Sequence, residues 1–191
     1  MRLSGRFYLI TMAQTATIFL WSIIGAAICG AAGLAAVKSS PETIERIEKI
    51  PRNRYIGLIV GWFALLMCVP HAQAVAPDFM LKLLYPLAVI VPIAGFFTVD
   101  HAASRAVSGT LILCSYNMIH LAFELDIAGT WFFSVCGWLS GAAGIWCSGL
   151  PWTWRDIFRK CAANNNFRKI SAGILFFFAA VYLVFCGVAA I

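Results

Sequence analysis

The chain has 191 residues, of which 62% are hydrophobic and 12% are charged. Soluble domains are about half apolar and about a quarter charged, so this composition excludes an ordinary water-soluble globule. Because a membrane span needs about 20 mostly apolar residues, the chain has room for roughly six spans and for no soluble catalytic domain. The sequence therefore predicts a polytopic integral membrane protein.

Long apolar runs define the predicted fold, an all-α single transmembrane domain over residues 1–191. Six such runs cover residues 7–37, 55–76, 79–99, 106–124, 128–150 and 170–190. The first run is longer than a bilayer is thick, so this helix must tilt, kink or project beyond the membrane. It is also about twice as long as the apolar core of a cleavable signal peptide, which favours a retained helix. Pro86 and Pro92 lie inside the third run and predict a kinked third helix.

The distribution of Lys and Arg predicts the orientation. Segments 38–54, 100–105 and 151–169 hold five, one and five of the fourteen basic residues, and Arg2, Arg6 and Lys82 are the other three. By the positive-inside rule, the three segments are cytoplasmic and both termini are outside. We expect a multi-pass protein of the cell membrane, in a bacterium the inner membrane. The net charge of +6 then reflects topology and attraction to anionic lipid, and we predict no nucleic-acid partner.

Two basic segments carry further local signals. Ser39 and Glu42 have capping-box spacing before isoleucines at every third position, which predicts a short amphipathic cytoplasmic helix that ends at Pro51. Its isoleucines either rest on lipid and neighbouring spans or dock a partner. Segment 151–169 mixes tryptophan with arginine, as interfacial anchors do, and residues 164–166 read as an asparagine turn.

Small residues at helical spacing predict close approach of helix backbones in several spans. These predicted packing positions are Ser22, Ala26, Gly30, Gly57, Gly61, Gly137, Gly141 and Gly144. The spacing does not say whether the facing helix belongs to this chain or to another subunit.

The fourth apolar run has a polar side. At 100° per residue, five residues fall within a 120° arc of the helix: Thr110, Cys114, Asn117, His120 and Glu124. This arc either lines a polar path or ligand site, with the last two residues as a titrating pair, or has a structural role. In the structural alternative, Asn117 forms interhelical hydrogen bonds and Glu124 reaches the outer water.

Metal and cofactor chemistry has little support in the sequence. Seven cysteines without a C-x-x-C pair predict neither a disulfide framework nor a zinc site, and we expect no metal. We also expect no cofactor. The alternative is haem b, because His71 and His120 lie at similar depth near the predicted outer ends of two spans and could be its two ligands.

In size and span count the chain resembles the substrate-capturing S-components of energy-coupling-factor vitamin transporters. The first helix of those proteins carries small residues that dock a partner, and Ala27, Ala31 and Ala35, or Ala32 and Ala36, match that idea. The resemblance implies six helices and a small-molecule substrate. S-components are expected to keep the N-terminus inside, which the charge count here opposes.

Three functions remain as hypotheses. The first is a non-catalytic subunit or an assembly or accessory protein of a membrane complex, associated with other membrane subunits or with itself. Scarce buried charge favours it, because coupled transporters keep ionisable groups near the midplane. The alternatives are a small transporter or substrate-binding membrane component, and a b-type haem-binding redox protein. We expect no enzyme activity, since no catalytic motif has usable spacing.

Overall fold

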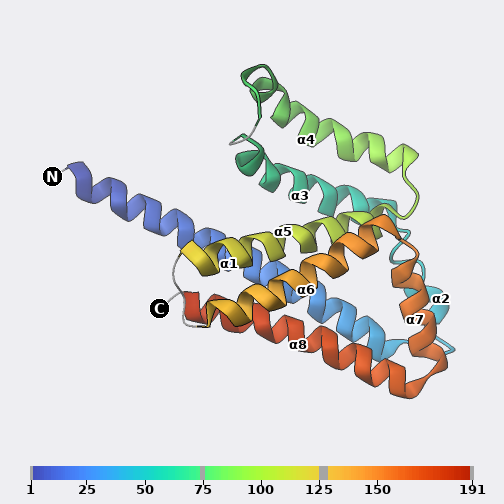
Figure 1. Cartoon of the computed structure of the whole chain (residues 1–191). Helices are drawn as coiled ribbons and strands as arrows, with labels where there is room; N and C mark the ends of the chain where they lie inside the picture. The colour runs from blue at the N-terminus through green and yellow to red at the C-terminus, as the bar shows by residue number, and fades with distance from the viewer. Residues whose placement is uncertain (1, 74–75, 125–128, 190–191) are drawn as a thin grey trace.

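A computed structural model describes residues 2–73, 76–124 and 129–189, and within these ranges every regular element is a helix. The all-α prediction is confirmed for this part of the chain. In chain order (Figure 1) the helices are α1 (Arg2–Lys38), α2 (Ile44–Ile47), α3 (Arg54–Gln73), α4 (Asp78–Thr98), α5 (Ala102–Glu124), α6 (Thr130–Gly149), α7 (Thr153–Ala163) and α8 (Asn165–Ala189).

Several helices are long and apolar enough to cross a membrane. Four segments meet this condition: Phe19–Lys38, Asp78–Thr98, Ala102–Glu124 and Asn165–Val188. A fifth candidate is α6 together with α7, although the two helices meet at an angle of 104°. The apolar part of α3, Arg54–Pro70, is shorter. The chain is thus a multi-pass membrane protein by length and composition, and the number of six spans stays a prediction.

The core forms where α1, α5, α6 and α8 meet. Helix α5 packs along α6, α3 and α1, while α8 packs along α1, so α5 is the central element (Figure 1). Trp21, Met118, Phe133, Tyr182 and Phe185 come from these four helices and form one buried apolar cluster. The N-terminal part of α1 projects beyond the other helices (Figure 1), and how this long helix sits in the membrane stays a prediction.

Helices α3 and α4 form a hairpin on the side of this bundle. Helix α4 packs mainly along α3, and the Trp62 indole nitrogen donates a hydrogen bond to the Val89 carbonyl at 2.8 Å. Pro86 and Pro92 both lie inside α4, which continues through them from Asp78 to Thr98. The predicted kink in this helix stays a prediction.

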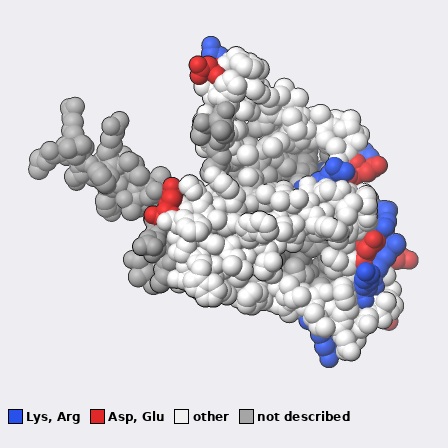
Figure 2. Space-filling view, viewed as in Figure 1, with Lys and Arg blue, Asp and Glu red and all other residues white. Residues whose placement is uncertain are grey.

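The basic segments come together at one end of the molecule. Arg159 forms an ion pair with Glu48, and Arg168 Nη1 donates to the Ser39 carbonyl at 3.1 Å. Ser104, in segment 100–105, connects to both of the other basic segments. Its amide donates a hydrogen bond to the Pro51 carbonyl, and its hydroxyl donates one to the Pro151 carbonyl. Lys and Arg side chains gather with acidic partners beside α2 and α7 (Figure 2). We call this region the basic end.

Two local predictions at the basic end are wrong. Helix α2 begins at Ile44, and Ser39 cannot cap it because its hydroxyl donates to the Ala35 carbonyl in the last turn of α1. The asparagines do not form a three-residue turn, since α8 already begins at Asn165. Asn164 instead caps α8, as its Oδ1 accepts the amides of the second and third residues that follow it.

The isoleucines of the α2 region rest on neighbouring helices. Ile47 is buried in a small cluster with Ala36, Phe158 and Cys161, and Ile44 packs against that cluster. This cluster holds α2 against the end of α1 and against α7. Ile44 and Ile47 therefore pack on neighbouring helices, as the first of the two alternatives for these isoleucines predicts.

Candidate functional site

The polar side of α5 is divided by the structure into a buried part and an exposed part. Thr110, Cys114 and Asn117 are buried among the helices, with exposed fractions of 1%, 1% and 2%. His120 and Glu124 lie in the last turns of α5, where their side chains are 49% and 44% exposed. One helix therefore brings all five residues onto one side, but it does not place them in one environment.

The two buried polar residues of this arc bond to their own helix. Thr110 Oγ1 donates to the Ala106 carbonyl at 2.8 Å, and Asn117 Nδ2 donates to the Leu113 carbonyl at 2.9 Å. Such bonds to the carbonyl four residues earlier satisfy polar atoms that hydrocarbon would leave unpaired. The hydrogen bond observed for Asn117 is thus within α5 and not between helices.

The exposed part of the arc is a histidine and carboxylate pair. His120 Nε2 lies 3.2 Å from Glu124 Oε1, and the His120 ring stacks on Tyr116 with centroids 5.7 Å apart. The pair lies at the C-terminal end of α5, and this end of the helix is opposite the basic end (Figure 1).

A buried hydroxyl network joins α5, α6 and α8. None of its three residues was among the predicted site residues. Ser115 Oγ is 2.7 Å from Ser140 Oγ, and the Tyr182 hydroxyl lies 3.1 Å and 3.0 Å from these two oxygens. Tyr182 is fully buried. Ser115 lies outside the polar arc, so a search for polar residues on one side of a helix does not find it. A search for any hydroxyl-bearing residue within the apolar runs would have found it.

The predicted small residues occupy different kinds of position. Ser22 and Ala26 are buried in α1, but a Cβ built on Gly30 meets no described atom within 4 Å. Gly57 is the tightest, because an added Cβ would lie 2.6 Å from backbone and side-chain carbons of Ala102. At Gly61 the nearest contact would be an ordinary 3.7 Å.

A second set of glycines lies between α5 and α6. An added Cβ would lie 2.7 Å from Ile119 at Gly137, 3.2 Å from Ser115 at Gly141 and 2.9 Å from Ile112 at Gly144. These distances are shorter than normal carbon contacts, so the two helices approach closely only because side chains are absent there. For these glycines the facing helix belongs to the same chain.

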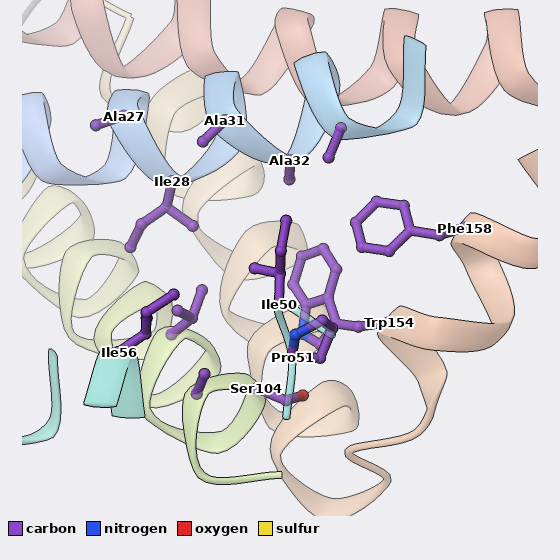
Figure 3. A pocket seen from close by; sticks show the side chains of 13 residues that line it. Ala27, Ile28, Ala31, Ala32, Ile50, Pro51, Ile56, Ser104, Trp154 and Phe158 are labelled. Carbon is purple, nitrogen blue, oxygen red and sulfur yellow. The ribbon is translucent and has the colours of Figure 1, made fainter. Parts of the chain in front are cut away.

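An apolar groove of about 370 Å³ lies beside α1 at the basic end (Figure 3). Its walls include Ala27, Ala31, Ala32, Ile50, Trp154 and Phe158, and we call it the α1 groove. The Trp154 indole nitrogen donates to Ser108 Oγ at 3.0 Å, which fixes one wall. Of the alanines in the S-component resemblance, Ala35 also lines the groove, whereas Ala36 is fully buried.

The residues proposed to bind haem are not brought together by what the structure describes. The side chain of His71 lies outside the described residues, and His120 contacts Glu124 and Tyr116. The described residues contain no group of three or more His, Cys, Asp or Glu suited to a metal ion. Haem binding therefore stays a prediction.

No protein-family model, curated protein or solved structure matches this chain. The geometry of the chain itself must therefore carry any functional argument.

Proposed function

We propose that the protein is a non-catalytic integral membrane subunit or accessory protein that joins a membrane complex through α4. The observation that carries the proposal is the position of this helix. Only 11% of its span is buried, compared with 33% to 50% of the other three single-helix candidate spans. Large apolar side chains such as Phe79, Ile90 and Phe97 are more than half exposed on it.

The interior of the bundle supports a role that depends on association. The buried hydroxyls of Ser115, Ser140 and Tyr182 bond to one another, and the buried part of the polar arc bonds to its own helix. These groups stabilise the fold, and α4, the candidate span with the smallest buried share, is the surface that we assign to another membrane protein. We place the basic end in the cytoplasm, because eleven of the fourteen Lys and Arg lie in its three segments.

Site-specific photo-crosslinking in native membranes tests the association. A photoreactive amino acid at Ile90 of α4 should crosslink one partner chain, while the same group at Ile174 of α8 should not. The two positions are matched, with exposed fractions of 57% and 53%. Equal crosslinking patterns at both positions, or lipid adducts alone at Ile90, would contradict a docking role for α4.

The orientation has its own test. Single cysteines replacing Glu45 and Asn165, in a background without native cysteines, should react with an impermeant maleimide only after the cytoplasmic side is opened. Labelling of either position in intact cells would reverse the orientation.

A small transporter or substrate-binding component is the second candidate, and the pair of His120 and Glu124 favours it. An exposed acid and base one helical turn apart could bind a polar substrate or relay protons. In this alternative, His120→Phe abolishes ligand binding or transport while the melting temperature of the protein is preserved. If the variant loses only stability, the pair is structural and this candidate is refuted.

A further inference from the structure

The α1 groove opens toward the surface along α1. Ala27 and Ala31 form part of its wall and are exposed, and Ile50 on the opposite side is 50% exposed. The volume of about 370 Å³ falls in the range of pockets that hold small ligands. Its lining is almost entirely hydrocarbon, and the polar atoms of its side chains, the Ser104 hydroxyl and the Trp154 indole nitrogen, both donate hydrogen bonds within the protein (Figure 3). Such a surface accepts an acyl chain.

Three arginines are chain neighbours of residues that line the groove. Arg52, Arg105 and Arg155 each directly follow a residue that lines the groove. All three act on His101: burial lowers the pKa of this histidine and the charges of the three arginines lower it further, while Asp100 opposes them. Arg155 pairs with Asp156 at 3.1 Å, whereas Arg52 and Arg105 form no ion pair among the described residues. Two guanidinium groups are therefore available to an external anion.

The depth of the site agrees with this combination of chemistry. The groove lies between the last turns of α1 and the beginning of α5, where apolar span meets charged loop. In a bilayer, acyl chains meet phosphate groups at this level, and basic pockets between spans are typical sites for anionic headgroups. Arginine also forms paired hydrogen bonds with phosphate oxygens.

We propose that the α1 groove binds an anionic phospholipid, with an acyl chain between α1 and Trp154 and the phosphate beside Arg52 and Arg105. This site does not depend on the proposed association through α4. A bound lipid would fill the space between α1, α7 and the start of α5, and would hold these elements together at the basic end.

Native mass spectrometry of the full chain tests the site. The protein is mixed in detergent with equal amounts of dioleoyl phosphatidylglycerol and dioleoyl phosphatidylcholine, and the retained lipids are counted. We expect one tightly held phosphatidylglycerol. The double variant Arg52→Gln and Arg105→Gln should weaken its retention about fivefold for each arginine removed. The control, Lys160→Gln with Lys169→Gln, removes the same charge elsewhere at the basic end and should retain the lipid as the wild type does.

A third variant tests the apolar part of the site. Ala31→Trp places a large ring in the groove and should lower retention of both lipids. The surface arginine variant decides the test if this one fails to fold. Equal loss of phosphatidylglycerol in the arginine and lysine variants would overturn the proposal, and so would equal retention of the two lipids by the wild type.

Discussion

Replacing Gly57 with alanine tests the described glycine at which an added Cβ would lie closest to a neighbouring helix. The new Cβ would lie 2.6 Å from the carbonyl carbon of Ala102 and 2.7 Å from the amide nitrogen of Ala103. Backbone atoms cannot rotate away as a side chain can, so α3 and α5 must separate. Overpacking of this kind costs about 1–3 kcal/mol. Gly109→Ala is the matched control, since its Cβ would meet no described atom within 4 Å and alanine favours a helix by about 0.5–1 kcal/mol.

The buried cysteines provide the assay. Six of the seven are buried as free thiols, and a thiol-reactive dye reports their exposure as the protein is heated in detergent. At roughly 2–4 °C per kcal/mol for a chain of this size, Gly57→Ala should lower the melting temperature by on the order of 5 °C. Gly109→Ala should leave it unchanged or raise it. A Gly57→Ala protein as stable as the wild type would show that α3 does not sit against α5 as described.

Three further predictions concern other contacts. Tyr182→Phe removes two hydrogen bonds between helices and should lower the unfolding free energy by about 1 kcal/mol. The same dye measures the effect, and an unchanged melting temperature would show that the network does not stabilise the fold. Asn117→Leu removes a hydrogen bond within α5, so it should lower the melting temperature without separating α5 from its neighbouring helices. A larger loss of crosslinking between α5 and α6 than of helicity would contradict this prediction.

The third of these predictions is a pH dependence. The hydrogen bond from Arg159 lowers the pKa of Glu48 below its ordinary value of 4.5, so the pair adds stability above that value and loses it as the pH falls through the folded-state pKa. The melting-temperature gap between wild type and Glu48→Gln should therefore narrow as the pH falls from 7 to below 4.5, and a constant gap would contradict the pairing.

The helices were largely predictable, because apolar runs bounded by charge fix where they begin and end. The run at 55–76 corresponds to Arg54–Gln73, and the run at 79–99 corresponds to Asp78–Thr98. The bend of 104° between α6 and α7 was not predictable. Tryptophan mixed with arginine in segment 151–169 indicates an interfacial anchor but does not give the direction of its helix relative to α6. Periodicity gives the angle of a residue on its own helix but not what covers it. His120 and Asn117 therefore share one arc and differ in burial.

The α1 groove was equally hidden from sequence reasoning. Its walls include parts of α1, α5 and α7 and the segment that follows α2. No local sequence pattern relates Ala31 to Trp154. The resemblance to S-components implied that alanines of α1 dock a partner, and the structure places four of these five alanines along an open groove. Only the assembled fold relates it to the arginines nearby.

We propose that this chain works as one component of a larger membrane complex. The most direct test of this proposal is the mass of the particle extracted with its surrounding lipid by a membrane-solubilising polymer, without detergent. We expect a particle in which the 20.9 kDa chain is accompanied by a second protein in fixed ratio. A particle that contains only this chain and lipid would contradict it.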